Sequence, residues 1–294
     1  MRMNYIARIQ AKLSRVKTIY TKRVTSRILD GSYNSIYKGR SMNFEELREY
    51  IPGDDVKDID WKASSRSTKT LVRQYIAEKK HNLLLVMDAN CRMLADTEEW
   101  EEKRDVAIMA AGMLAYLVNR NGDYVGAIYS SEKALAHYPF RTGLANIENI
   151  LNHYHKDVTT ENKSDVDTAL SYIARNERRR TILILVTDYE GIRKIRENTL
   201  RQLLLQHDVL AIVTSDMPMT GKKVYDIAAK QYIPTFLSRS KQLERFEKTE
   251  REKLKKECDE KLKRFGIAKI EISNTDEIDR EVISLLEMHK IEKR

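Results

Sequence analysis

The stretch NLLLVMD, residues 82–88, decides the fold class. Its five central side chains are all apolar, which is typical of a strand that is buried on both faces of a parallel sheet. A second run of this kind, TILILVTD, occupies residues 181–188, and a third, DVLAIVTS, occupies residues 208–215. Helical patterns separate these runs, so the sequence predicts strands that alternate with helices.

The predicted elements continue in this α/β order to the end of the chain. We expect strands at 82–88, 124–130, 134–140, 181–188, 208–215 and 268–273, and helices at 98–120, 143–154, 165–177, 194–206, 239–265 and 276–290. Residues 216–237 are expected to form an excursion with short strands at 222–228 and 231–237. The apolar positions place Trp100 on the inner face of the first helix, and Leu243, Phe246, Leu254, Leu262 and Phe265 on that of the long one. Residues 81–294 should therefore form a doubly wound, mainly parallel sheet with helices on both faces.

Composition indicates an ordered, water-soluble protein. Of the 294 residues, 41% are hydrophobic and 33% are charged, and no stretch approaches eighteen consecutive apolar residues. The N-terminus lacks the apolar core of a secretory signal. Only Cys91 and Cys258 are present, which favours a reducing compartment over a disulfide framework. We expect the protein to be cytoplasmic.

The net charge of +9 is concentrated at the N-terminus. Residues 1–40 contain ten Lys or Arg and one Asp, which accounts for the whole excess. Residues 1–35 also have a helical apolar stripe, so they are predicted to form a basic amphipathic helical segment. This segment could dock on its own domain, or it could contact an anionic membrane surface or a partner's acidic groove. Tethered nucleic-acid binding is a further alternative, although aromatic stacking residues are missing, and we expect no nucleic-acid partner. The stripe consists of Ile6, Ile9, Leu13, Val16, Tyr20, Val24 and Ile28.

Two of the predicted strands end in aspartate. Asp88 closes the first and Asp188 closes the central one, and ligands of open α/β sheets gather at the carboxyl ends of strands. Carboxylate oxygens suit Mg²⁺ or Mn²⁺. Asn90 could add an amide oxygen from the same loop, and Ser164 could add a hydroxyl from a later helix start. The sequence thus offers four candidate metal ligands.

The arrangement resembles the von Willebrand factor A domain. Its metal-ion-dependent adhesion site uses an Asp-x-Ser-x-Ser loop after the first strand, a later Thr, and an Asp after the central strand. Asp88, Asn90, Ser164 and Asp188 match four of these positions, and Arg92 occupies that of the second Ser. A guanidinium has no acceptor atom and stays protonated, so it cannot bind a metal ion. Two hypotheses remain: a weak Mg²⁺ or Mn²⁺ site, or a degenerate site in which Arg92 replaces the ion.

Other chemistries have little support in the sequence. There is no G-x-G-x-x-G after a strand, no G-x-x-x-x-G-K-[ST], no H-E-x-x-H and no G-x-S-x-G. A metal-dependent hydrolase that uses Asp88 and Asp188 is an alternative function, but a positioned base or nucleophile is missing. We therefore predict no catalytic residue and no enzymatic activity.

The stretch REYIPGDDVKDIDWKAS, residues 48–64, contains four Asp residues within seven positions. An EF-hand loop counted from Asp54 would need Gly and Glu where Ile59 and Ser65 stand, so calcium binding by that motif is excluded. Pro52-Gly53 indicates a turn, which Asp54 and Asp55 could fix through bonds to nearby backbone N–H groups.

The wider string, residues 39–75, resembles the signature of a bacterial and archaeal family, domain of unknown function 58, in which it precedes a von Willebrand A-like domain. The signature or partner-binding residues are Arg48, Tyr50, Pro52, Gly53, Asp54, Asp55, Asp60, Trp61, Ser64 and Arg66. The resemblance implies that residues 36–80 form a signature segment that packs on a von Willebrand A-like domain at 81–294, with Asp60 and Trp61 as the anchor.

The family resemblance also implies a function. Members are associated with AAA ATPases of the MoxR type and are thought to act as adaptors in the assembly or maturation of other proteins. We accordingly expect a non-enzymatic adaptor with a MoxR-type ATPase and a client protein as partners. Many members carry transmembrane helices near the N-terminus, whereas this chain shows none, and its basic segment could provide a peripheral membrane contact instead.

Overall fold

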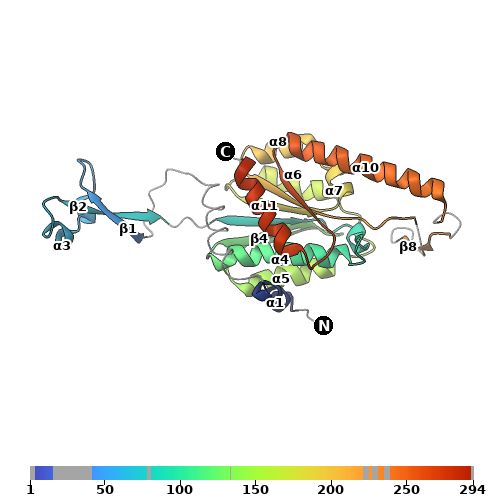
Figure 1. Ribbon diagram of the computed structural model, residues 1–294, viewed down its shortest axis with the longest axis horizontal. Helices are drawn as coiled ribbons and strands as arrows, with labels where there is room; N and C mark the ends of the chain where they lie inside the picture. Colours follow the sequence, from blue (N-terminus) through green and yellow to red (C-terminus); the bar gives the residue numbers. More distant parts are fainter. Residues whose placement is uncertain are drawn as a thin grey trace. The chain divides into compact units, whose positions relative to one another are not determined.

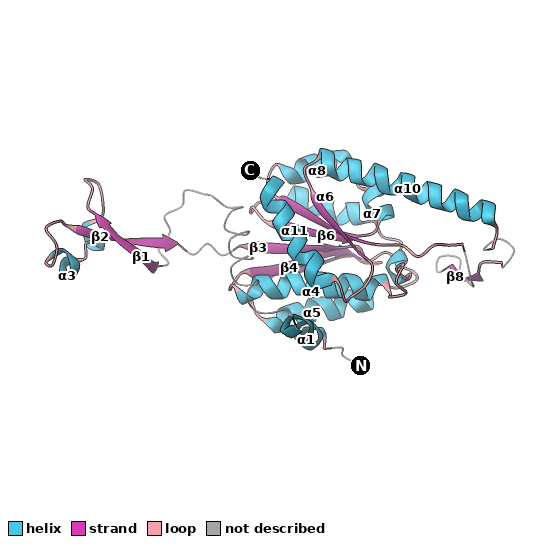
Figure 2. Ribbon diagram, in the orientation of Figure 1, coloured by secondary structure: helices cyan, strands magenta, loops and turns pink. Residues whose placement is uncertain are grey.

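The computed structural model describes residues 4–15, 42–77, 81–132, 134–220, 225–226, 231–234 and 239–292. The chain divides into two compact units, one formed by residues 1–32 with 81–294 and the other by residues 33–80. The first unit contains a six-stranded sheet with helices on both faces (Figure 1, Figure 2). The second contains a two-stranded hairpin.

The six-stranded sheet has the order β10-β7-β6-β3-β4-β5. All neighbouring strands run parallel except β4 and β5, which pair antiparallel at one edge. Five of the strands consist mostly of buried residues because helices cover both faces of the sheet. The strands are β3 (Asn82–Met87), β4 (Tyr124–Ser130), β5 (Leu135–Arg141), β6 (Ile182–Thr187), β7 (Asp208–Thr214) and β10 (Ala268–Ile272).

The strand order reverses between β3 and β6. From β3 the chain adds β4 and β5 on one side, and from β6 it adds β7 and β10 on the other. Such a reversal separates the loops that follow the two central strands and leaves a crevice at their carboxyl ends, where ligands bind in doubly wound sheets. The two strands that end in Asp88 and Asp188 are the two that flank this point.

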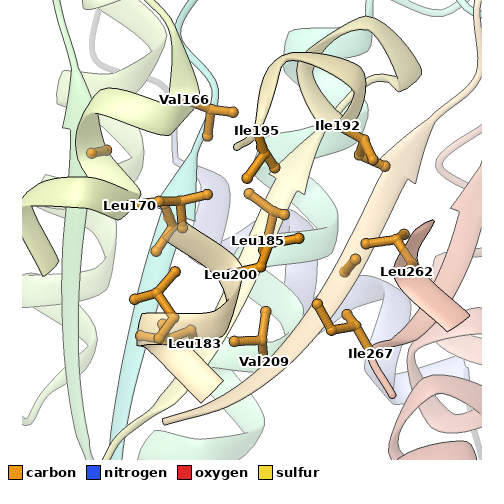
Figure 3. Close-up of a cluster of buried hydrophobic side chains, with 14 of the residues drawn as sticks. Val166, Leu170, Leu183, Leu185, Ile192, Ile195, Leu200, Val209, Leu262 and Ile267 are labelled. Atoms are coloured by element: carbon orange, nitrogen blue, oxygen red, sulfur yellow. The ribbon is translucent and has the colours of Figure 1, made fainter. Parts of the chain in front are cut away.

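Helices form a layer on each face of the sheet. Helix α4 contacts α5, α11 and several strands on one face, while α6, α7, α8 and α10 cover the other. Figure 3 shows the core of that second layer, where Leu183 and Leu185 of β6 meet Leu170, Leu200 and Leu262 from three helices. The helices are α4 (Lys103–Arg120), α5 (Leu144–Asp157), α6 (Val166–Asn176), α7 (Tyr189–Lys194), α8 (Glu197–Leu204), α10 (Lys241–Arg264) and α11 (Ile278–Glu292).

The N-terminal helix α1 (Tyr5–Arg15) docks on α4 and α5. Tyr5 and Ile9 are fully buried there, and the two carboxylate oxygens of Glu148 accept bonds from the backbone N–H groups of residues 5 and 6 at 3.0 and 2.8 Å. Ile9 approaches α4 at Gly112, where an added Cβ would lie 2.6 Å from its Cδ1 atom. Residues 4–15 thus dock on their own domain, one of the two predicted alternatives. The rest of the predicted segment, from Val16 onward, lies outside the described residues.

The first predicted helix begins later than expected. Helix α4 starts at Lys103, and residues 95–102 form a tight loop in which the Thr97 N–H bonds the Glu101 carbonyl at 2.8 Å. Trp100 lies in this loop with φ 64° and is 74% exposed, so its predicted inward position is wrong. The apolar spacing of a helix continues by chance into residues 98–102, but the backbone there forms a loop instead.

Three further predictions need correction. The predicted helix at 194–206 is α8, which starts only at Glu197, and the preceding helix α7 was not predicted; Asp188 begins α7 by accepting a bond from the Gly191 N–H. In α10, Leu243 and Phe246 are 39% and 64% exposed rather than inward, since this end of the helix extends past the sheet (Figure 1). The excursion forms the short pair β8 (Tyr225–Asp226) and β9 (Gln231–Tyr232), and most of the remaining residues of its predicted strands lie outside the described residues.

The smaller unit is a hairpin with one short helix. Strands β1 (Met42–Glu49) and β2 (Leu71–Ala77) pair antiparallel, and the connection between them holds the 3-10 turn η1 (Val56–Asp58) and helix α3 (Trp61–Ser64). The expected packing of residues 36–80 on the following domain remains a prediction. Throughout the described ranges, every helix is too short or too polar to cross a membrane.

Candidate functional site

The candidate site lies at the carboxyl ends of β3 and β6. The strands are in parallel register with Met87 opposite Val186, and the Asp88 N–H bonds the Val186 carbonyl at 2.8 Å. Asp88 and Asp188 therefore leave the sheet side by side, and they are only 1% and 0% exposed. The sequence-based prediction that the two aspartates meet is correct.

The loop after β3 folds so that the side chain of Arg92 lies over this pair. The Asp88 carboxylate accepts a bond from the Asn90 N–H at 3.0 Å, and the Asn90 side-chain oxygen accepts one from the Arg92 N–H at 3.1 Å. These two Asx turns start the short 3-10 helix η2 (Cys91–Leu94). Asn90 also donates to the Ser164 carbonyl at 2.7 Å, which ties this loop to the start of α6. Asn90 is thus next to Asp88 and contacts the backbone of Ser164, and the role of both as metal ligands remains a prediction.

The Arg92 guanidinium bridges both aspartates. Its Nε donates to Asp188 Oδ2 at 3.1 Å, and its Nη2 donates to Asp88 Oδ2 at 3.1 Å and to Asp188 Oδ1 at 3.3 Å. The Arg92 side chain remains 25% exposed, while both carboxylates are buried beneath it. A planar, permanently charged group in this position neutralises the pair from the solvent side.

Lys103 is a second cation that the sequence analysis missed. Its ammonium donates to Asp188 Oδ2 at 3.2 Å and pairs with Asp216, and the residue is 1% exposed. Lys103 is the first residue of α4, where the helix dipole disfavours positive charge. The sequence carries no signal for this pairing, because the predicted helix began at residue 98 and did not place Lys103 at a helix start. We call Asp88, Arg92, Lys103 and Asp188 the rim network.

Two small residues complete the packing around the rim network. The Thr187 hydroxyl donates to Asp88 Oδ2 at 2.7 Å, and the Gly191 N–H donates to Asp188 Oδ1 at 2.7 Å. A Cβ at Gly191 would lie 1.9 Å from the Thr187 hydroxyl and 2.8 Å from Asp88 Oδ2. Glycine is therefore required at position 191, because Thr187 and Asp88 occupy the space of a Cβ atom. The sequence alone does not reveal these two neighbours.

The two carboxylates have opposite electrostatic environments. Burial disfavours the charged form of Asp188, but the charges of Lys103 and Arg92 outweigh it and hold the pKa of this carboxyl well below its usual range. Burial and the neighbouring Asp188 charge raise the pKa of Asp88, and Arg92 opposes them only in part. Asp188 is thus the firmly ionised member of the pair.

The donor set does not fit a divalent cation. The Asn90 oxygen faces the backbone of its own turn, and the Ser164 hydroxyl donates to the Ser130 carbonyl at 2.6 Å. Arg92 and Lys103 already bond the carboxylate oxygens that a metal would need. No group of three His, Cys, Asp or Glu that could hold a metal occurs in the described part of the chain. The geometry favours replacement of the ion by Arg92, and the Mg²⁺ or Mn²⁺ site remains a prediction.

The Asp-rich stretch of the smaller unit uses its carboxylates for local structure. Arg48 forms a two-bond fork with Asp54 at 2.8 and 2.6 Å, and Asp54 also accepts a bond from the Ile51 N–H at 3.0 Å. Gly53 has φ 108° in the turn after Pro52, and Asp55 begins η1 through a bond from the Lys57 N–H. Asp54 and Asp55 thus fix the turn, as the sequence analysis expected.

Asp60 begins helix α3 and also pairs with Arg73 at 2.9 Å. Ser64 holds the far end of this helix by bonding both backbone groups of Leu71. Trp61, between them, is 66% exposed, and its predicted role as an anchor remains a prediction. Of the other signature residues, Tyr50 bonds the Thr70 carbonyl through its N–H at 2.9 Å, and Arg66 is exposed.

Comparison with known proteins gives a family match that runs across both units. The model of a family described as "Protein of unknown function DUF58" matches residues 46–226. An uncharacterized protein of Mycobacterium tuberculosis, Rv1480, is 31% identical over 192 residues, which cover 64% of this chain and 60% of that protein. The chain thus spans less than two thirds of the length of this relative.

Solved structures of other bacterial proteins are similar at low identity. BatB from Bacteroides thetaiotaomicron has a TM-score of 0.45 and 13% identity, over 71% of this chain and 98% of that chain. A von Willebrand factor type A structure from Catenulispora acidiphila has a TM-score of 0.40 and 10% identity, over 74% of this chain and 43% of that chain. The predicted α/β class is confirmed: the larger unit has a mostly parallel sheet between two helical layers.

Proposed function

The chain belongs to the DUF58 family, and we propose that it is a non-catalytic adaptor that binds a partner protein at the carboxyl edge of its sheet. The observation that carries this proposal is Trp100. It is 74% exposed in the loop between η2 and α4, and its backbone has a φ of 64°, which is rare and costly for a bulky residue. Trp is one of the residue types that are enriched among the hot spots of protein interfaces.

The rim network supports binding rather than catalysis. Asp88 accepts three hydrogen bonds, from Asn90, Arg92 and Thr187, and Asp188 accepts bonds from Gly191, Arg92 and Lys103. Carboxylates held by fixed cations and donors are poorly placed to accept a proton from substrate or water. The rim network would therefore fix the loops around it, including the one that carries Trp100, and the hydrolase alternative gains no support from this geometry.

The proposal includes a degenerate metal site and a specific class of partner. Arg92 takes the place of the divalent ion, so partner binding at this edge is independent of Mg²⁺. The family resemblance names the partner as a MoxR-type AAA ATPase, with the adaptor selecting a client protein. A cytoplasmic location, with or without peripheral membrane contact by the N-terminal segment, belongs to the same proposal.

The partner proposal is tested with the MoxR-type ATPase encoded by the same genome. Binding of the purified full chain is measured by biolayer interferometry in EDTA and in Mg²⁺. We expect equal affinity in both, and a loss of about tenfold or more for Trp100→Ala, as for an interface hot spot. Leu205→Ala, 84% exposed before the amino end of β7, is the matched control and should bind normally. A complex that requires Mg²⁺, or phosphoester turnover that does, would contradict the proposal.

The degenerate site is tested by removing the cation that replaces the metal. In Arg92→Ser the two carboxylates lose their bridge and regain a hydroxyl at the position of the second Ser, so Mg²⁺ should raise its melting temperature. The wild type should show no shift in the same titration. Arg193→Ser, an exposed arginine on α7, controls for loss of charge alone. A Mg²⁺ response in the wild type, or none in Arg92→Ser, would refute the replacement.

A further inference from the structure

A groove of about 470 Å³ opens beside the rim network, between α10 and the loop that follows β7. Asp216 and Pro218 line it from the loop, Tyr189 lines it from the start of α7, and Glu98 lines it from the loop that carries Trp100. Its volume lies in the range of sites that hold a ligand side chain or a small peptide segment. The groove is therefore part of the same edge of the sheet.

The groove has the opposite charge to the chain as a whole. Six acidic and three basic side chains line it, although the protein has a net charge of +9. Two of the three cations are already paired: Arg251 bonds Glu98 at 2.9 Å, and Lys255 bonds Glu271 at 2.6 Å. A positively charged group is thus favoured electrostatically inside the groove. The acidic residues are Glu98, Asp216, Glu244, Glu247, Glu252 and Glu271, and the basic residues are Lys248, Arg251 and Lys255.

Apolar side chains line the groove among the acidic ones. Tyr189 comes from the start of α7, Pro218 from the loop after β7, and Leu254 from α10. Glu247 ties this loop to α10, because its carboxylate accepts bonds from the backbone N–H groups of Met219 and Thr220 at 2.5 and 2.9 Å. The apolar lining is therefore held on connected elements rather than on free loops.

We infer that this groove binds a partner segment that carries Lys or Arg next to apolar side chains. The inference rests on the proposed function, since it specifies the chemistry of the partner at that edge. The negative lining selects the cation, and Tyr189, Pro218 and Leu254 contact the apolar neighbours. Asp216 lines the groove and also pairs with buried Lys103, so a bound cation shares a carboxylate with the rim network.

The probe is an amphipathic peptide of Leu and Lys about 15 residues long, near the length at which an isolated helix becomes stable. Its fluorescein-labelled form is titrated with the full chain at about 0.15 M salt, where long-range attraction is screened. We expect saturable binding that weakens about tenfold in Glu244→Lys/Glu252→Lys. The same peptide with Glu in place of Lys should not bind.

The matched control is Glu250→Lys/Glu257→Lys, which makes the same charge change at exposed positions of α10 that do not line the groove. It should retain the affinity of the wild type. Equal weakening by both double variants, or equal binding of the two peptides, would overturn the inference. So would a dimer in light scattering that Glu244→Lys/Glu252→Lys dissolves, because a second copy would then be the occupant. If the peptide does not bind but the ATPase still binds through Trp100, the groove inference is refuted and the proposed function is not.

Discussion

The rim network and the Asp-rich turn of the smaller unit use the same side chains in different environments. In both, arginine bridges aspartate: Arg92 binds Asp88 and Asp188, and Arg48 binds Asp54. At the rim both carboxylates are 1% exposed, whereas the Asp54 carboxylate is 16% exposed and Arg48 is 30% exposed. Coulomb interactions strengthen as water is excluded, so burial rather than residue type decides how much each pair contributes.

The largest expected effect is at Lys103. Lys103→Met keeps the length of the side chain but leaves Asp188 and Asp216 without this cation, and breaking a buried ion pair in this way costs about 3–5 kcal/mol. The free energy of unfolding, measured with denaturant, should fall by that amount. Arg193→Met, which breaks an exposed pair with Glu190, should cost only about 0–1 kcal/mol. Similar losses in the two variants would mean that burial does not decide how much an ion pair contributes in this protein.

The second effect concerns close packing around the rim network. Gly191→Ala places a Cβ against the Thr187 hydroxyl and Asp88, neither of which can move without losing its hydrogen bond, and overpacking of this kind costs about 1–3 kcal/mol. Gly112→Ala is the matched variant, because the atoms it meets are the ends of the flexible side chains of Ile9 and Leu151. Thermal unfolding should rank Gly191→Ala as the more destabilised. The reverse order would show that the rim is more adaptable than its hydrogen bonds indicate.

Much of the rim network could be predicted from the sequence, but one of its two cations could not. The runs at 82–88 and 181–188 established the sheet and brought Asp88 and Asp188 together, because a buried parallel strand has a simple apolar signature. Arg92 was recognised through its position in the loop. Lys103 was missed because its partners, Asp188 and Asp216, are distant in sequence, and long-range ion pairs leave no local pattern.

The exposed residues were the least predictable. Helical spacing placed Trp100 and Phe246 inward, whereas loop closure exposes Trp100 and the extension of α10 past the sheet exposes Phe246. Periodicity identifies the face that a helix could bury, but not whether another element covers it. The same limit applies to the groove, whose lining residues are as far apart in the sequence as Glu98 and Glu271, so that only tertiary structure brings them together.

The third prediction uses pH to separate the two rim carboxylates. The pKa of Asp188 is held below its usual value, so the unfolded state binds the extra proton and stability falls as pH drops below about 4. Asp188→Asn should flatten this acid limb by at most about 1.4 kcal/mol per pH unit. The raised pKa of Asp88 acts with the opposite sign above that pH, so Asp88→Asn should make stability rise more steeply with pH there. The slopes come from denaturant titrations at several pH values, and parallel curves for the two variants would contradict the assignment.

The smallest effect is expected at Arg48. Arg48→Gln removes the fork to Asp54, but both side chains reach water, so global unfolding should change much less than in Lys103→Met. The consequence should be local, because Asp54 also accepts the bond from the Ile51 N–H that closes the turn. Hydrogen exchange of that amide should accelerate in the variant, and salt should accelerate it in the wild type, since screening acts on exposed pairs. Arg66→Gln, an exposed arginine of the same unit, should leave the Ile51 amide unchanged. A global loss of stability in Arg48→Gln comparable to that in Lys103→Met would show that the smaller unit depends on its ion pair as strongly as the rim does, and partial exposure would then be a poor guide to the strength of the bridge.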